Sequence, residues 1–364
     1  MGKHKVLVMG AGKIGTTVAV MLSRTSDYIV FIADINQPTL PIINNNSLQF
    51  KKLSIKEPNE IISFIKANQI NGIVSCLPFN LTIEVAKIAS HCGIDYFDPT
   101  EDVATTETVY ELAKTGKNSF APQCGLAPGF ISIAANSLMQ EFDDIDYVKM
   151  RVGALTPNIN NSLNYAFTWS IDGVINEYIR PCIVIENGER KLKSALSDLE
   201  TVIVDNFCYE AFNTSGGVGS LVDSVLGKVK NMDYKTMRYP GHCDKMSFVF
   251  NDLKLRDDPA LAKKILTNVI PYTDHDKVVI NVAVQGNVNA QFIEKTYTKT
   301  LLPKTVDGNL YTAIQMTTAT SICTVIDLVM HEKKLSGLIK QEQISLKDFL
   351  ANRFGCYYLN HQHY

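Results

Sequence analysis

A glycine-rich turn near the start of the sequence constrains the fold more than any other feature. The run GAGKIG, residues 10–15, follows the apolar residues VLVM and precedes a segment whose apolar residues recur at helical spacing. Glycine is costly inside a helix or a strand, so this cluster indicates a backbone that turns tightly or approaches another group closely. The context predicts a strand at 5–9, then a turn, then an amphipathic helix.

The turn matches the G-x-G-x-x-G pattern of dinucleotide-binding proteins. Gly10 permits the tight turn, Gly12 leaves room for a pyrophosphate, and Gly15 lets the helix lie close to the sheet. The helix N-terminus would present backbone N–H groups and the positive end of its dipole to the phosphates. A Walker-type P-loop is excluded because G-K-[ST] does not occur. The alternative is a glycine-rich turn that holds no ligand.

An acidic residue at the end of the second predicted strand, 29–33, indicates which dinucleotide is bound. The carboxylate of Asp34 would accept hydrogen bonds from the adenosine ribose hydroxyls, and its charge would repel a 2′-phosphate. No arginine follows in the run ADINQP, residues 33–38. We therefore predict NAD as the cofactor, with NADP as the less favoured alternative.

The first third of the chain alternates between short apolar strands and helices, which predicts an α/β fold with a Rossmann-type, doubly wound parallel sheet. Pro58 and Asn80 are expected to start two of the helices, Asn80 as an N-cap. The remaining strands are expected at 72–77, 96–97 and 119–121.

After GLAPGF, residues 125–130, the pattern changes to longer alternating segments with hairpin signals. Asn187-Gly188 is the strongest of these signals, and Gly286-Asn287 repeats it. We predict an α+β substrate domain with a mainly antiparallel sheet. It would contain helices at 131–142, near 219–228 and at 259–270, and a further helix from Tyr311 to about Lys333 would return to the first domain. The predicted domains are 1–127 (dinucleotide-binding), 128–302 (substrate) and 303–364 (C-terminal helices).

Composition and charge narrow the class of protein further. The chain has 364 residues and a formal net charge of −2, and the absence of a dense Lys/Arg tract argues against nucleic acid as a partner. Its apolar stretches are shorter than the roughly 20 residues that a membrane span needs. The first residues do not have the pattern of a secretory signal, so we expect a cytoplasmic protein. The cysteines and histidines form no C-x-x-C or H-E-x-x-H pattern, and no metal site is expected.

Motifs in both halves of the chain resemble those of the saccharopine dehydrogenase family. In the first half they are SCLPFN (75–80), FDPTED (97–102) and CGLAPGF (124–130). In the second half they are NYAFTWSIDGVINEY (164–178), EAFNTSGGVGSL (210–221) and MDYKTMRYPGH (232–242). Within the family, the compact length is most similar to the lysine 6-dehydrogenases. The resemblance implies a nicotinamide-dependent enzyme that acts at a C–N bond of an amino acid, with an active site between two domains and often a homodimer.

Cofactor contacts are expected from the glycine turn and from the carboxyl ends of the strands, where ligands of doubly wound sheets lie. The resemblance places the nicotinamide ribose near the later strand ends. The predicted contacts are Gly10, Ala11, Gly12, Lys13, Ile14, Gly15, Asp34, Ile35, Cys76, Leu77, Pro78, Thr100 and Leu126.

Arg238, in the motif KTMRYPGH, is the predicted anchor of the substrate carboxylate. A planar guanidinium binds a carboxylate through two parallel hydrogen bonds, which a lysine reproduces less well. Thr236 and Tyr239 are its predicted companions, and Tyr165 is expected to line the substrate pocket. The alternative for Arg238 is an ion pair at the surface or at a domain interface.

Oxidation of an amine also requires a group that accepts the amine's proton, because an ammonium has no lone pair to stabilise an iminium. Asp98 and His242 are the predicted catalytic residues, with Glu101 as a further candidate. Histidine titrates in a useful range, but a lone histidine after a Pro-Gly turn is often structural. Asp98 lies at a strand end, where it could instead cap the next helix.

The expected activity is the oxidative ε-deamination of L-lysine to the semialdehyde or its cyclic imine. The nearest alternatives are a saccharopine dehydrogenase and a carboxynorspermidine-type dehydrogenase, both of which act on a secondary amine. A different class is a sensor that binds a dinucleotide without turnover. Such a sensor would need no carboxylate anchor, and Arg238 would then have no function in it.

Overall fold

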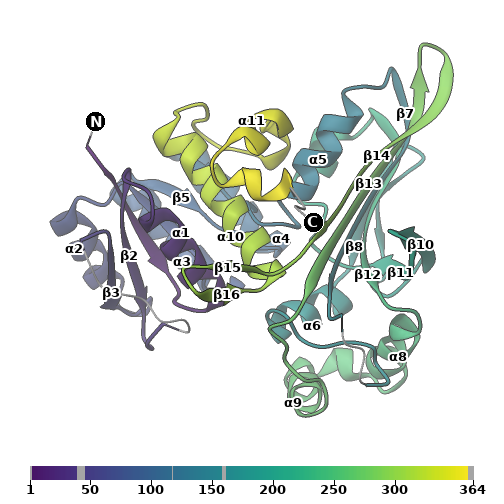
Figure 1. Cartoon of the computed structure of the whole chain (residues 1–364), viewed down its shortest axis with the longest axis horizontal. Helices are drawn as coiled ribbons and strands as arrows, with labels where there is room; N and C mark the ends of the chain where they lie inside the picture. The colour runs from purple at the N-terminus through teal and green to yellow at the C-terminus, as the bar shows by residue number, and fades with distance from the viewer. Residues whose placement is uncertain (1, 39–45, 117, 158–160, 360–364) are drawn as a thin grey trace. The chain divides into compact units, whose positions relative to one another are not determined.

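The computed structural model describes residues 2–38, 46–116, 118–157 and 161–359, which form two compact units (Figure 1). Unit 1 comprises Met1–Phe130 and Gln315–Tyr364, and unit 2 comprises Ile131–Ile314. The chain therefore begins unit 1, builds unit 2, and returns to unit 1.

Unit 1 contains a six-stranded sheet in the order β3-β2-β1-β4-β5-β6. All its neighbouring strands are parallel. This is the order of the doubly wound dinucleotide-binding fold, so the predicted fold class is confirmed. The strands are β1 His4–Met9, β2 Tyr28–Asp34, β3 Leu48–Lys52, β4 Gly72–Ser75, β5 Asp95–Phe97 and β6 Phe120–Ala121.

Helices cover both faces of this sheet. On one face, α2, α3 and α4 enclose a core that contains Ile61, Val85 and Val109. On the other face lie α1 and α10, where the Cys323 thiol approaches the Val18 carbonyl. The helices are α1 Lys13–Ser23, α2 Pro58–Asn68, α3 Phe79–Cys92, α4 Val103–Thr115, α10 Ala313–Ile326 and α11 Leu346–Ala351.

Helix α10 continues as a π-helix over Asp327–His331. Together they are long and apolar enough to cross a membrane, but 89% of this stretch is buried inside the protein. Asp327 accepts hydrogen bonds from the Tyr28 hydroxyl and from Arg353. Such burial and tertiary bonding are typical of a core helix.

Unit 2 is built on an eight-stranded sheet with the path β10-β11-β12-β7-β13-β14. Only β12 and β7 run parallel along this path, so the predicted mainly antiparallel sheet is confirmed. The β8–β9 hairpin joins β12 from the side. The strands are β7 Asp144–Leu155, β8 Cys182–Glu186, β9 Glu189–Lys193, β10 Glu200–Val204, β11 Phe207–Asn213, β12 Val229–Arg238, β13 Lys277–Val288 and β14 Gln291–Leu301.

The helices of unit 2 include three, α6, α8 and α9, that share one hydrophobic cluster with Phe212 of β11. Tyr178 and Met246 are fully buried members of this cluster. The helices that lie wholly or mostly in this unit are α5 Phe130–Met139, α6 Ile171–Ile179, α7 Leu221–Val225, α8 His242–Ser247 and α9 Pro259–Val269.

Three local predictions differ from the structure. The second predicted hairpin turns at Asn289-Ala290 rather than at Gly286-Asn287, which lie within β13 where its register to β7 shifts. Pro78, not Asn80, is the N-cap of α3. Residues 304–311, assigned to C-terminal helices, form the hairpin of β15 (Lys304–Val306) and β16 (Asn309–Tyr311).

Candidate active site

The glycine turn of unit 1 is shaped by contacts that exclude side chains at two of its positions. Gly10 has a φ of +103°, and a Cβ atom there would lie 2.7 Å from the Cys76 carbonyl oxygen. A Cβ at Gly15 would lie 1.9 Å from the Gly10 carbonyl oxygen. These two glycines are therefore required by the fold of the turn itself.

Gly12 differs from these two glycines because a Cβ there would meet no atom within 4 Å. It is exposed, has an ordinary φ of −70°, and is the N-cap of α1 without a side chain to cap the helix. The fold does not require glycine here, whereas a pyrophosphate lying against the backbone does. This open position fits a bound dinucleotide.

Asp34 connects the end of β2 to the glycine turn. Its Oδ2 accepts a hydrogen bond of 2.7 Å from the backbone N–H of Ala11, and its Oδ1 accepts one of 2.9 Å from Asn36. These bonds hold the carboxylate beside the turn, which is the position that a dinucleotide-binding fold uses for the ribose of the cofactor.

The remaining predicted cofactor residues lie at the same edge of the sheet. They follow the carboxyl ends of neighbouring strands, which is where doubly wound sheets bind their ligands. After β4 come Cys76, Leu77 and Pro78; after β5 comes Thr100; after β6 comes Leu126; and Lys13, Ile14 and Ile35 follow β1 and β2.

Asp98 also lies at this edge, directly after β5, and it is completely buried. Its Oδ1 accepts a 2.8 Å hydrogen bond from the backbone of Thr100. Burial raises the pKa of Asp98 to about 6, although Tyr96 and two backbone N–H groups oppose the rise. Asp98 does not cap the next helix, because Asp102 does so by accepting from Thr105.

Glu101 follows Asp98 in the same loop. Burial raises the pKa of its carboxyl group, and the nearby Asp102 and Asp98 raise it further. The environment of Glu101 therefore favours the protonated carboxyl group more strongly than the environment of an exposed glutamate does.

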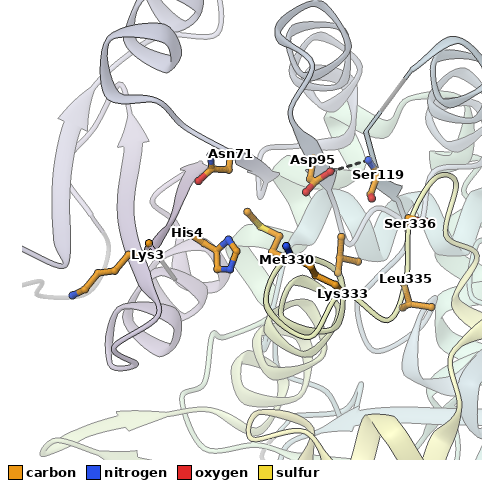
Figure 2. Close-up of a pocket in the computed structure, with 11 residues that line it drawn as sticks. Lys3, His4, Asn71, Asp95, Ser119, Met330, Lys333, Leu335 and Ser336 are labelled. Carbon is orange, nitrogen blue, oxygen red and sulfur yellow. Dashed lines mark hydrogen bonds between the residues drawn. The ribbon is translucent and has the colours of Figure 1, made fainter.

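A pocket of about 570 Å³ lies at the opposite edge of the same sheet (Figure 2). It is lined by His4 and Asp95, which begin β1 and β5, and by Ser119, which donates its backbone N–H to Asp95. Dinucleotides bind at the carboxyl ends of strands, so this pocket at the amino ends is not the predicted cofactor site.

Arg238 is the last residue of β12 in unit 2, and its side chain is 1% exposed. Its Nε donates to the Tyr178 hydroxyl at 3.0 Å, and its Nη1 donates to Thr236 Oγ1 at 3.0 Å and to the Met237 carbonyl at 2.9 Å. The guanidinium lies over the Tyr165 ring, 4.9 Å from its centroid. Arg238, Thr236 and Tyr165 are thus brought together, as their predicted roles require.

Arg238 makes no ion pair with a carboxylate in the described part of the chain. A second buried arginine of unit 2, Arg151, shows the contrast: it pairs with Glu200 and with Asp233, the latter at 2.6 Å. Burying a guanidinium without a counter-ion is costly. Arg238 lacks such a direct pair, although the buried Glu177 acts on it electrostatically.

Two of the sequence motifs in unit 2 contain buried hydroxyl groups for which the described residues show no hydrogen-bond partner. The Tyr165 and Thr168 hydroxyls belong to the motif 164–178, and the Thr214 hydroxyl belongs to the motif 210–221. Native proteins satisfy most buried polar groups, so these hydroxyls are candidates for contact with a polar ligand. Sequence reasoning missed Thr168 and Thr214, because isolated threonines carry no distinguishing pattern.

Tyr239 does not belong to the group around Arg238. Its hydroxyl donates to the Thr156 carbonyl at 2.9 Å, and its ring lies 5.8 Å from the Tyr209 ring in a separate hydrophobic cluster. Because successive side chains of an extended segment point to opposite faces, neighbours in sequence separate here. The expectation that Tyr239 accompanies Arg238 at the substrate is not supported.

His242 is completely buried at the start of α8. Its ring nitrogens lie 2.8 Å from the Leu163 carbonyl oxygen and 3.0 Å from the Tyr178 hydroxyl. Burial and the nearby Arg238 charge lower the pKa of His242 to about 3. So weak a base is poorly suited to accept the proton of an amine, which argues against the predicted role of His242 as proton acceptor. Tyr178 was not singled out, because an aromatic residue in an amphipathic helix usually indicates only a core position.

Two family models match most of the chain. The saccharopine dehydrogenase NADP-binding domain matches residues 6–119, and the saccharopine dehydrogenase C-terminal domain matches residues 125–354. The chain belongs to the saccharopine dehydrogenase family. The resemblance carried by the sequence motifs is thereby confirmed.

The saccharopine dehydrogenase family consists of oxidoreductases that act on CH–NH groups, which confirms the predicted class of enzyme. The description of its first domain also supports a nicotinamide dinucleotide as the cofactor. No group of three or more His, Cys, Asp or Glu side chains that could hold a metal ion occurs among the described residues.

Curated relatives of this saccharopine dehydrogenase family member include the mitochondrial alpha-aminoadipic semialdehyde synthases of Rattus norvegicus and Mus musculus. Each is 22% identical over 247 residues, which are 66% of this chain and 23% of the relative. The chain thus matches about a quarter of the length of these relatives. A solved structure, the apo saccharopine dehydrogenase (L-Glu forming) of Saccharomyces cerevisiae, shares the fold with a TM-score of 0.73 at 14% identity, over 95% of each chain.

Proposed function

We propose that this protein is an NAD-dependent amino-acid dehydrogenase that oxidises the ε-carbon–nitrogen bond of L-lysine. The observation that carries the proposal is Arg238, a buried guanidinium that forms no ion pair with a carboxylate of the described residues, although the charge of Glu177 acts on it. A carboxylate that arrives with the substrate would complete this site, because guanidinium and carboxylate form strong, directional pairs.

The reaction needs a group that binds the substrate carboxylate, a group that accepts a proton from the amine, and an acceptor for the hydride. The substrate carboxylate pairs with Arg238. The ε-amine, with an ordinary pKa near 10.4, must lose a proton, and Asp98 is our candidate for its acceptor because a pKa of about 6 leaves it ionised at neutral pH. A bound nicotinamide would supply the acceptor for the hydride that leaves the ε-carbon. Water or the α-amine then adds to the imine carbon, and ammonia leaves in either case, giving the semialdehyde or the cyclic imine.

The number of anchors favours lysine over a substrate with several carboxylates. The buried cationic side chains of unit 2 are those of Arg151, Lys235 and Arg238. Arg151 and Lys235 both pair with Asp233 and Glu200. Arg238 alone among these three is left for a substrate carboxylate, and lysine carries one. The second candidate, saccharopine, is favoured by the fold shared with the yeast enzyme.

NAD is the proposed cofactor because of Asp34. Its carboxylate is held beside the glycine turn by the Ala11 N–H, where it would accept bonds from ribose hydroxyls and repel a 2′-phosphate. NADP is the second candidate, because Lys52 of β3 pairs in register with Asp34 and a cation there would attract a phosphate.

The deciding experiment offers the purified protein NAD or NADP together with L-lysine, L-ornithine, L-saccharopine or carboxynorspermidine, and follows the absorbance of the reduced cofactor. We expect turnover with lysine and NAD. Activity on saccharopine but not on lysine overturns the substrate, and a preference for NADP overturns the argument from Asp34. Binding of dinucleotide without turnover on any of these amines would instead indicate the sensor.

The homodimer, the cytoplasmic location and the other proposed substrate contacts stay predictions. Sedimentation of the purified chain at micromolar concentration measures its oligomeric state directly, and a mass of one chain would contradict the dimer.

A further inference from the structure

A chain of hydrogen bonds leads from Arg238 into the interior of unit 2. The guanidinium Nε lies 3.0 Å from the Tyr178 hydroxyl. The same hydroxyl lies 3.0 Å from His242 Nε2, and His242 Nδ1 lies 2.8 Å from the Leu163 carbonyl oxygen. The chain therefore joins β12, α6 and α8 with the loop before α6.

The groups at the two ends of this hydrogen-bond chain determine which atom donates and which accepts in each of its hydrogen bonds. The Leu163 carbonyl only accepts, so His242 Nδ1 carries the proton and donates it. Burial and the charge of Arg238 keep the imidazole neutral by lowering its pKa to about 3, so Nε2 is an acceptor. The Tyr178 hydroxyl, whose pKa burial raises, must then donate to Nε2. Its lone pair is left to accept from the Nε of Arg238.

We infer that His242 is a positioning residue for the proposed carboxylate anchor: it directs the Tyr178 hydroxyl, and that hydroxyl holds the guanidinium of Arg238 in place. The inference rests on the proposed function. His242 would act through two hydrogen bonds rather than by touching the substrate or accepting its proton.

The hydrogen bond between Arg238 and Thr236 has the same arrangement as the one between Arg238 and Tyr178. Thr236 Oγ1 accepts from Nη1 of Arg238 and donates to the Val152 carbonyl at 3.3 Å. Each hydroxyl is thus oriented by a group behind it and presents a lone pair to the guanidinium.

A purely structural role for His242 is the competing explanation, since its ring also stacks on Phe212 at 6.3 Å. The variants Tyr178→Phe, His242→Leu and His242→Gln separate the two. Tyr178→Phe removes only the hydroxyl. His242→Gln retains an amide that can accept from Tyr178 and donate to Leu163, whereas His242→Leu retains neither.

We expect Tyr178→Phe and His242→Leu to raise the KM for the amino acid about tenfold to a hundredfold, the range expected when a charged group loses a hydrogen-bond partner. The kcat should stay within about threefold, and the KM for the dinucleotide should be unchanged. His242→Gln should recover most of the loss and keep the pH profile of the unaltered enzyme. An unchanged amino-acid KM in Tyr178→Phe, or a kcat lost while KM is kept in His242→Gln, overturns the inference.

Arg238→Lys distinguishes failure of the inference from failure of the proposed function. If it raises the amino-acid KM while Tyr178→Phe and His242→Leu do not, the anchor stands and the positioning role is wrong. If Arg238→Lys leaves that KM unchanged, the proposed anchor itself is wrong.

Nuclear magnetic resonance of the full chain labelled with ¹⁵N-histidine tests the hydrogen-bond chain without any turnover. The signals of His242 are identified by their loss in His242→Gln. We expect a protonated Nδ1 and an unprotonated Nε2 at neutral pH, with the Nε2 shift moving in Tyr178→Phe. A protonated Nε2 overturns the inference whatever the substrate is.

Discussion

Gly12 and Gly15 lie in the same turn, but the space around their Cα atoms differs, and substitutions at the two positions should have different effects. The space around Gly12 is open, so Gly12→Ala should keep the free energy of unfolding within about 1 kcal/mol. The added methyl group would occupy the place of the pyrophosphate. We expect dinucleotide affinity to fall at least about tenfold, measured by calorimetric titration.

Gly15→Ala provides the control for this prediction. Its methyl group would press on the Gly10 carbonyl at 1.9 Å, and we expect a loss of about 3 kcal/mol in the free energy of unfolding. If Gly12→Ala bound the dinucleotide as tightly as the unaltered protein, the turn would not be the pyrophosphate site.

The two buried arginines of unit 2 should respond oppositely to replacement by methionine. Arg151→Met leaves Asp233 buried without its cation, and we expect a loss of about 3 kcal/mol in the free energy of unfolding. Arg238→Met breaks no direct ion pair, although it removes a cation that acts on Glu177, and Tyr178 and Thr236 keep the acceptors to which they donate. We expect a loss of less than about 1 kcal/mol together with loss of amino-acid binding.

Urea unfolding followed by the fluorescence of Trp169, the single tryptophan, measures both variants in unit 2, where all three residues lie. Equal destabilisation by Arg151→Met and Arg238→Met would contradict the view that Arg238 is reserved for a ligand.

Asp98 should make stability depend on pH. Its folded-state pKa of about 6 exceeds the value near 3.9 of an unfolded aspartate. The folded protein therefore binds more protons between these values, and the contribution of Asp98 lowers the free energy of unfolding as pH rises from 4 to 6. Relative to the unaltered protein, Asp98→Asn should gain about 2 kcal/mol between pH 4 and pH 7. A difference that stays constant with pH, in urea titrations at each pH, would contradict the raised pKa.

Among the elements, the β7–β13 pair contains the irregularity that sequence reasoning misread. A Cβ at Gly286 would lie 2.1 Å from the Asp144 carbonyl oxygen of the neighbouring strand. We expect Gly286→Ala to lower the free energy of unfolding of unit 2 by about 2 to 3 kcal/mol, since the bulge must move. Gly188→Ala is the matched control, because Gly188 has a φ of +80° but open space around it, and about 1 kcal/mol is expected.

Elements with a strong local signal were predictable from the sequence. The glycine turn, the strands beside it and the Asn187-Gly188 hairpin follow directly from composition and spacing. Strand β3 was missed because the alternation in LQFKK is too short to stand out from a loop, and the strand lies at the edge of the sheet. The Gly286 bulge was mistaken for a turn because Gly-Asn signals both, and only the neighbouring strand distinguishes them.

The site was predictable only in part, for a physical reason. Arg238 and Asp34 could be chosen because their charge chemistry is visible in a motif. The role of His242 could not, since the tautomer and the basicity of an imidazole depend on what surrounds it, here Tyr178 and Leu163. The separation of Tyr239 from Arg238 likewise depends on the face to which each side chain points.

At the scale of the whole molecule, the division into two units predicts which strands a bound dinucleotide stabilises against local unfolding. A ligand stabilises the state that binds it, by about 2.7 kcal/mol at a hundred times its dissociation constant. We expect NAD to slow hydrogen exchange in the β1, β2 and β4 strands of unit 1 and to leave the β13–β14 pair of unit 2 unchanged. Mass spectrometry with and without NAD measures this. Equal slowing in both units, or slowing that persists in Gly12→Ala, would contradict the assignment.

The interruption of unit 1 by unit 2 has a consequence for synthesis on the ribosome. All the strands of the parallel sheet are made first, but α10, which covers one face of that sheet beside α1, emerges only after residues 131–314. At usual rates of translation, this delay lasts roughly 10 to 40 seconds. During this delay the nascent strands of unit 1 keep apolar surface uncovered, whereas unit 2, which is one continuous stretch of sequence, can complete its own folding. We therefore expect the nascent unit 1 to bind chaperones.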